Sequence, residues 1–167
     1  QSHWFSVGSI VAWAEPGVGV VATQSIVEVS YGPLGLALMK GGMTAEQALK
    51  ALLSIDQTPE VRQVAMLDKN GIVAVHTGSK CIPEAGHIIG EGFSVQANLM
   101  RSSRVWPEMA EAFKNTKGPL HQRLLASLEA AENAGGDIRG KQSACILIVK
   151  TSTSGCTWKD RIMDLRV

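Results

Sequence analysis

Apolar and polar residues repeat at two different periods along the chain, and each change of period predicts a new element. Four short apolar or alternating runs in the first half are joined pairwise by tight turns, which predicts two β-hairpins: 9–14 with 18–25, and 61–68 with 72–75. The second hairpin turns at Asn-Gly, the strongest short-range hairpin signal. Three later runs also predict strands: 92–98, 143–150 and 161–167. Tight turns between neighbouring strands imply antiparallel pairing.

Helical spacing of apolar residues appears in two separate parts of the chain. The first part, 34–53, is interrupted by a Gly-Gly pair, after which Thr44 opens a capping box. The second part divides into 104–115 and 120–133, with a Gly-Pro pair between them. Strand and helix groups that alternate in this way predict one α+β domain of antiparallel sheets packed against helices.

Composition narrows the class of protein. At 167 residues the chain has the length of one domain, which buries roughly 70% of the surface that its unfolded form exposes. A net charge of +1 without a basic cluster gives no footprint for nucleic acid or an anionic membrane, and no apolar run reaches the length of a membrane span. The odd, widely spaced cysteines (Cys81, Cys145 and Cys156) indicate free thiols in a reducing compartment rather than a disulfide framework.

Two groups of polar side chains stand out from the apolar strands. One group shares a single face of strand 92–98, because side chains alternate along a strand: Ser94, Gln96 and Asn98. The other ends strand 18–25: Thr23, Gln24 and Ser25. A solvent-facing strand face explains each group as well as a ligand-facing one does. We expect both groups to face one cleft near the loop 2–8, since strand ends beside Gly/Pro loops are common sites.

The glycine-rich stretch 72–100 also holds His76, Cys81 and His87, which raise two other possibilities. Their spacing matches no common zinc motif and no fourth ligand is near, so we expect no metal. Cys81 with a neighbouring histidine is a candidate thiol nucleophile. The competing interpretations are a buried Cys81 that packs as a small hydrophobe and a structural His76. Asp137 and Arg139 indicate a structural clamp rather than catalysis.

Long segments of the chain resemble a known family, among them VAVHTGSKCIPEAGH, GEGFSVQANLM and GGDIRGKQSACILIV. The resemblance is to domain-of-unknown-function family 1028, a prokaryotic family placed in the N-terminal nucleophile (Ntn) hydrolase superfamily, and it covers residues 1–167. It implies a four-layer αββα sandwich of two antiparallel sheets. It also implies an N-terminal Thr, Ser or Cys that attacks an amide, with its own α-amino group as base. Gln1 has neither hydroxyl nor thiol, so we expect a domain truncated at both ends that lacks its nucleophile.

Comparison with proteasome-type members of that superfamily implies site residues. In those members, the strand after a tight turn supplies the backbone N–H donor of the oxyanion hole, and the corresponding position here is Gln24. A Phe-Ser-Val segment precedes a polar strand end at their active site, and here such a segment leads to Gln96 and Asn98. Gln24, Gln96 and Asn98 are therefore the candidate catalytic residues. The candidate substrate-binding residues lie at the polar strand ends and in the loops around these three: Ser2, His3, Ser6, Thr23, Ser25 and His76.

These expectations together describe a cytoplasmic amidohydrolase that cleaves an amide bond in a small, amino-acid-derived substrate. We expect no cofactor, no nucleic-acid partner and no membrane association, and we expect a homo-oligomer. Two alternatives remain open: a non-catalytic Ntn-fold protein that binds a ligand or builds an oligomer, and a thiol enzyme based on Cys81. A nucleophile at the mature N-terminus would favour the enzyme.

Overall fold

A computed structural model describes residues 1–167. Its largest sheet has four strands in sequence order: β1 (Ala12–Glu15), β2 (Gly19–Ser25), β3 (Arg62–Asp68) and β4 (Val73–Thr77). All neighbours are antiparallel, so both predicted hairpins are confirmed. The two hairpins join through the β2–β3 pair, in which Gln24 lies opposite Gln63.

The remaining strands form two separate antiparallel hairpins: β5 (Gly86–Gly90) with β6 (Phe93–Ala97), and β7 (Cys145–Val149) with β8 (Arg161–Arg166). β6 pairs only with β5, and β7 pairs only with β8. Each hairpin therefore keeps unpaired strand edges. Those of β6 and β7 belong to strands at the candidate site, and that of β8 lies on the outside of its hairpin.

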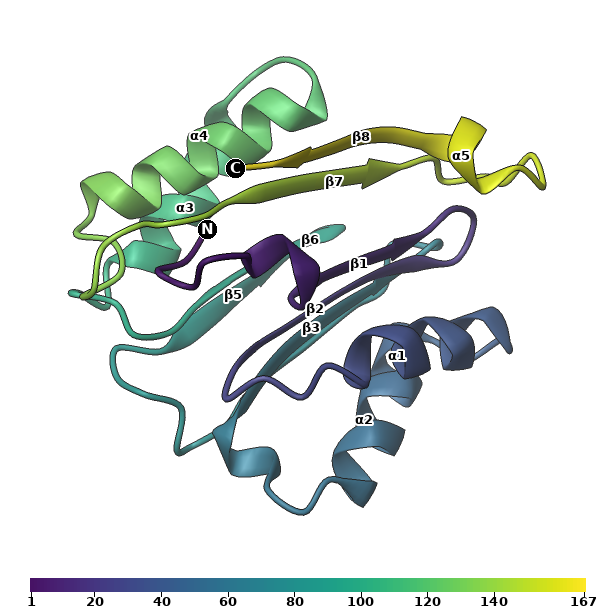
Figure 1. Cartoon of the computed structure of the whole chain (residues 1–167), viewed down its shortest axis with the longest axis horizontal. Helices are drawn as coiled ribbons and strands as arrows, with labels where there is room; N and C mark the ends of the chain where they lie inside the picture. The colour runs from purple at the N-terminus through teal and green to yellow at the C-terminus, as the bar shows by residue number, and fades with distance from the viewer.

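Helices cover the strands on two sides. α1 (Tyr31–Lys40) and α2 (Ala45–Ile55) lie against the four-stranded sheet, while α3 (Val105–Asn115) and α4 (Leu120–Asn133) lie beyond the two hairpins (Figure 1). A short α5 (Thr157–Asp160) precedes β8, and 3₁₀ turns occupy Val7–Ser9 (η1) and Pro59–Val61 (η2). The predicted α+β class with antiparallel sheets is confirmed. None of the helices combines the length and the apolar character needed to cross a membrane.

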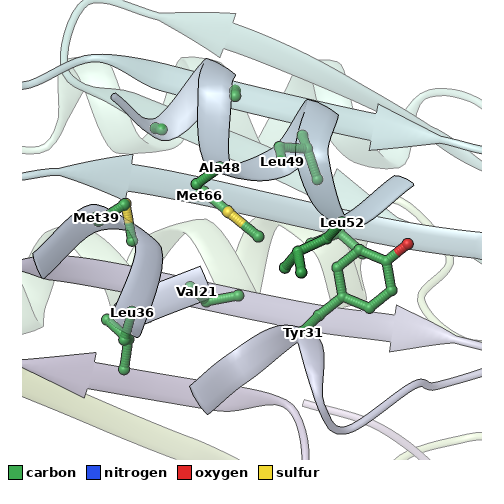
Figure 2. Close-up of a cluster of buried hydrophobic side chains, with 11 residues drawn as sticks. Val21, Tyr31, Leu36, Met39, Ala48, Leu49, Leu52 and Met66 are labelled. Atoms are coloured by element: carbon green, nitrogen blue, oxygen red, sulfur yellow. The ribbon is translucent and has the colours of Figure 1, made fainter. Parts of the chain in front are cut away.

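The main core lies between α1, α2 and the four-stranded sheet (Figure 2). Met66 and Val21 project from β3 and β2 and are almost fully buried beneath the two helices. Gly35 lets α1 approach closely, since a Cβ there would lie 2.8 Å from the Met66 methyl carbon. The predicted capping box at Thr44 is confirmed, and it orients α2 over the same core.

A second, smaller core joins α3 and α4 to β6, with Val105 and Val95 among its buried residues. This core is less complete, because Leu120 and Leu125 of α4 remain 45% and 48% exposed. The helix predicted over 120–133 is therefore confirmed, although its apolar face is only partly covered.

Two boundaries differ from the predictions, and two elements were not predicted. α1 begins at Tyr31 rather than at residue 34, so Gly32 and Pro33 lie in its first turn. β1 begins at Ala12 rather than at residue 9, because η1 occupies the preceding residues. The glycines around β5 predict a loop, but Gly86 is a packing position in a strand: a Cβ there would lie 2.5 Å from the Trp106 ring. α5 has no counterpart in the sequence pattern, since four residues carry no helical period.

Candidate functional site

The buried side chain of Gln63 joins the four-stranded sheet to the β5–β6 hairpin. It is fully buried near the start of β3. Its Oε1 accepts hydrogen bonds from Gln24 Nε2 at 2.7 Å and from Asn98 Nδ2 at 3.0 Å. Its Nε2 donates to the Thr77 hydroxyl at 2.9 Å and to carbonyls of β6 and β5 at 3.0 and 3.2 Å. Two residues predicted from separate strands, Gln24 and Asn98, therefore meet at one oxygen. We call Gln63 with its side-chain partners Gln24, Asn98 and Thr77 the Gln63 network.

The Gln63 network continues to His87, whose Nδ1 lies 2.8 Å from the Thr77 hydroxyl oxygen. Burial, reinforced by the nearby His76, lowers the pKa of His87, so its imidazole is neutral at pH 7. A hydroxyl paired with a neutral imidazole resembles a nucleophile and its base. However, neither Thr77 nor His87 lines the large cavity described next, so this pair ties β4 to β5 rather than facing a ligand.

A cavity of about 790 Å³ lies between the four-stranded sheet and helices α3 and α4. Its walls are mostly apolar, and strands β6 and β7, each of which has one unpaired edge, both line it. Polar side chains from the ends of β2 and β6 also line it: Gln24, Ser25, Ser94, Gln96 and Asn98. Ser94 donates to Gln96 Oε1 at 3.1 Å, which leaves the Gln96 Nε2 group without a hydrogen bond. The size and the few convergent polar groups are those of a small-molecule site.

Backbone strain marks the same two strand ends. Ser25 (φ 71°) and Leu99 (φ 60°) are the non-glycine residues with positive φ, and both line the cavity. Such left-handed conformations cost ~1–3 kcal/mol each and cluster at functional sites. Ser25 Oγ is also the one buried side-chain oxygen or nitrogen without a hydrogen-bond partner. A buried hydroxyl without a partner is uncommon in folded proteins and marks this strand end as unusual.

An ion pair holds the chain that follows Ser25. Arg62 Nε donates to Asp56 Oδ2 at 2.8 Å, and Arg62 Nη1 donates to the Ile26 carbonyl at 2.8 Å. The Tyr31 hydroxyl also donates to Asp56 Oδ2, at 3.0 Å. The Arg62 hydrogen bonds are the main reason that the pKa of Asp56 falls to about 2. This ion pair anchors the segment after Ser25 to the start of β3 and so supports the left-handed backbone of Ser25.

An ion pair between Arg139 and Asp137 lines the cavity. Arg139 Nε and Nη2 donate to the two oxygens of Asp137 at 2.9 and 2.7 Å, which is the clamp predicted from the sequence. Burial opposes ionisation of Asp137, yet the hydrogen bonds from Arg139 hold its pKa below the usual range. Both residues line the cavity, and Arg139 Nη1 makes no hydrogen bond. The guanidinium is thus held at a fixed place with one nitrogen free.

The predicted site residues divide into two groups. Those that line the cavity are Ser2, Gln24, Ser25, Gln96 and Asn98. Those that do not are His3, Ser6, Thr23 and His76. The Thr23 hydroxyl is fully buried and donates to the Glu28 carbonyl at 3.0 Å, and His76 Nε2 bonds the Pro59 carbonyl oxygen at 2.8 Å. These two side chains serve the fold.

Sequence reasoning missed Gln63 and took Arg139 as a clamp alone. A signal for Gln63 exists, because alternation places this polar residue on the same strand face as the apolar Ala65 and Leu67. A polar side chain at such a position needs hydrogen-bond partners from neighbouring strands.

Cys81 is a packing residue in this structure. Its side chain is buried and donates to the Arg62 carbonyl at 3.2 Å. All three cysteines are free thiols, as predicted. No three His, Cys, Asp or Glu side chains come together in a way that would hold a metal ion.

The comparisons with known proteins agree with one another. A model of the family of unknown function DUF1028 matches residues 1–167. The crystal structure of protein SPO2555 from Silicibacter pomeroyi, described under the same family, is similar to this chain with a TM-score of 0.83 and 29% sequence identity, over 96% of this chain and 67% of that one. No curated protein matches. The chain therefore belongs to the family of unknown function DUF1028.

Proposed function

We propose that this protein is an Ntn-type amidohydrolase that cleaves an amide bond in a small, amino-acid-derived substrate. The layer order supports the proposal: helices α1 and α2, the four-stranded sheet, the two hairpins, then α3 and α4 (Figure 1). This order supports the proposal of a four-layer αββα sandwich, in which the two hairpins would belong to one sheet with a gap between β6 and β7. Fold analogy alone does not give a reaction, so the proposal depends on the chemistry of the cavity.

The observation that carries the proposal is the convergence of free amide and hydroxyl groups on one apolar cavity. Gln96 Nε2 and Ser25 Oγ are both unpaired there. A substrate amide offers the matching acceptor and donor, and the Gln96 N–H donor can stabilise the oxyanion that forms when the carbonyl is attacked. Gln24 and Asn98 both donate hydrogen bonds to Gln63, so their side chains are oriented before a substrate binds.

Arg139 defines the substrate class. Its free Nη1 at the cavity is suited to a carboxylate, because a guanidinium donates in a fixed planar geometry to such oxygens. The apolar walls suit a hydrocarbon side chain. An N-acyl amino acid has all three parts: a carboxylate, an amide and an apolar group.

The attacking group is proposed to lie on a strand outside residues 1–167. None of the hydroxyls that line the cavity has a base as its hydrogen-bond partner. Ser94 donates to Gln96, Ser127 donates to the Met109 carbonyl, and Ser2 accepts from the Trp4 backbone N–H. Ser25 and Thr151 make no side-chain hydrogen bond. The unpaired edges of β6 and β7 both belong to strands that line the cavity, and we propose that a strand between them carries the attacking residue. There, a Thr, Ser or Cys side chain adds to the amide carbonyl and its α-amino group takes the proton. The amine then leaves with that proton, and water releases the acyl group.

Turnover tests the proposal. Protein that carries the additional N-terminal strand should hydrolyse N-acyl amino acids. Replacing Gln96 by Leu should lower kcat/KM by roughly 10²-fold, the usual cost of one oxyanion donor. The exposed Gln57, changed to Leu, is the matched control and should leave kcat/KM unchanged. Equal activity of the Gln96 and Gln57 variants would refute the role of Gln96.

A binding protein is the second candidate, and one observation favours it. No hydroxyl or thiol that lines the cavity is hydrogen-bonded to a base. Under this alternative, the extended protein binds N-acyl amino acids by calorimetry and releases no product over long incubation. Under the amidohydrolase proposal, the same incubation yields free amino acid.

A further inference from the structure

Strand β8 has an open edge at the outside of its hairpin. Val167 and Ala144 exchange both backbone hydrogen bonds. Since such pairs alternate along an antiparallel ladder, Leu165 and Met163 also direct their backbone groups toward β7. The N–H and C=O groups of Asp164 and Arg166 therefore point to the outer edge, where no strand pairs with them. The regular ladder ends at Met163, because the register shifts between Ile148 and Val149 of β7. An edge of this kind is a template for another strand.

The side chains along this edge are more apolar than an unpartnered edge usually is. Ile162, Leu165 and Val167 are 60%, 56% and 87% exposed, and Trp158 in the preceding helix is 74% exposed. A hollow of about 310 Å³ runs along the strand beside Trp158, Ile162 and Met163. Edges of free strands normally carry lysine, proline or an inward-pointing charge that prevents pairing. β8 has no lysine or proline, and its charged residues are Arg161, Asp164 and Arg166.

We propose that β8 pairs with β8 of a second copy, antiparallel, with the two-fold axis at Leu165. In this register Leu165 lies opposite Leu165 of the other copy, Met163 lies opposite Val167, and Asp164 lies opposite Arg166. The outward backbone groups of Asp164 and Arg166 then face each other, as a hydrogen-bonded pair requires. An isologous strand pair of this kind closes into a dimer and leaves no further edge at the interface.

Charge selects this register among those that the backbone allows. Moving the axis by one residue, to Asp164, would place Asp164 opposite Asp164. With the axis at Leu165, Asp164 and Arg166 each meet the opposite charge of the other copy, in addition to the 2.7 Å ion pair that they form with each other within one strand. Met163, Leu165 and Val167 meet apolar residues. Opposite charges directly across a strand pair stabilise it, and like charges destabilise it. The sequence Met-Asp-Leu-Arg-Val is thus self-complementary when read antiparallel.

The expected dimer is weak. One strand pair buries less area than a standard protein interface, so we expect a micromolar, concentration-dependent equilibrium. The proposal is independent of the amidohydrolase function, because β8 residues do not line the large cavity.

The test uses the position on the two-fold axis. Leu165→Arg and Leu165→Glu each place two like charges opposite each other in a homodimer. Sedimentation velocity should show concentration-dependent dimers of the wild type, and each variant alone should weaken association at least about tenfold. An equimolar mixture of the two variants should form heterodimers, since the introduced arginine and glutamate then face each other across the axis. Leu165 is exposed, so thermal unfolding of both variants should match the wild type.

Matched changes at Ile138, which is 47% exposed on a different part of the surface, are the control and should leave association unchanged. Asp164→Arg mixed with Arg166→Asp tests the register, because only this heterodimer restores both opposite-charge pairs across the axis. A wild type that stays monomeric at hundreds of micromolar would overturn the proposal. So would dimers of Leu165→Arg as strong as those of the wild type, or mixtures that associate no better than the separate variants.

Discussion

Replacing Gln63 by Leu should strongly destabilise the protein, because this one side chain forms hydrogen bonds to β2, β4, β5 and β6. The substitution nearly preserves volume and removes every bond that the amide makes. Gln63 has 0% exposure, so water cannot replace its bonds within β3. Gln24 and Asn98 border the cavity and can regain partners there, whereas Ala97 is a buried residue whose carbonyl loses this donor.

The magnitude follows from these contacts. An unsatisfied buried carbonyl costs ~1–3 kcal/mol, and each partly exposed partner that must find a new bond costs ~0.5–1.5 kcal/mol. For one buried carbonyl and the two partners Gln24 and Asn98, the sum for Gln63→Leu is therefore ~2–6 kcal/mol. For a domain of this size, each kcal/mol lowers Tm by roughly 2–4 °C, so a decrease of about 10 °C is expected.

Urea unfolding followed by circular dichroism measures this free energy, and calorimetry measures Tm. Gln57→Leu is the matched control, since Gln57 is exposed and makes no side-chain hydrogen bond, and it should stay within ~0.5 kcal/mol of the wild type. If Gln63→Leu lowered the unfolding free energy by less than ~1 kcal/mol, the Gln63 network would not exist as described.

Three further predictions concern the surroundings of the cavity. The pKa of His87 is lowered in the folded state, so the unfolded chain binds more protons than the folded chain just below about pH 6.5. Tm should therefore fall as pH drops from about 7.5 to about 5.5, and this fall should be smaller in His87→Asn. Asp56 has a pKa of about 2, below its unfolded value, so the stability that its charge contributes is present above about pH 4 and is lost as pH falls toward 2. Asp56→Asn should remove that pH dependence and lower the free energy of unfolding at pH 7 by ~3 kcal/mol, measured by urea unfolding. Cys81→Ala should change stability by ~1 kcal/mol and leave any turnover of the extended protein intact, whereas loss of turnover would restore the thiol-enzyme alternative.

The predictable part of the fold is the part set by local pattern. Alternation and the Asn70-Gly71 turn predict the β3–β4 hairpin, and the capping box at Thr44 predicts α2. β5 escapes prediction because its glycines at 86 and 90 have the character of turn residues. Gly86 in fact makes room for the Trp106 ring, a contact with a later helix that no local pattern contains.

The candidate site shows the same division. Alternation places Gln96 on one strand face and correctly groups it with Ser94, because this depends only on side-chain direction. Gln24 and Asn98 come together through Gln63, which requires the β2–β3 register and the approach of β6. The strain at Ser25 and Leu99 is likewise a property of the packed chain. The sequence could indicate polar strand ends, but not the cavity that they share.

Isothermal titration with N-acetylleucine tests the central claim, that the cavity recognises an amino-acid-derived amide through Gln96 and Arg139. We predict binding to the wild type, at least about tenfold weaker binding to Gln96→Leu and to Arg139→Gln, and unchanged binding to the Gln57→Leu control. The methyl ester of N-acetylleucine, which has no carboxylate, should bind the wild type as weakly as the acid binds Arg139→Gln. Equal affinity of the wild type and both cavity variants for N-acetylleucine, or no binding to any of them, would contradict the account.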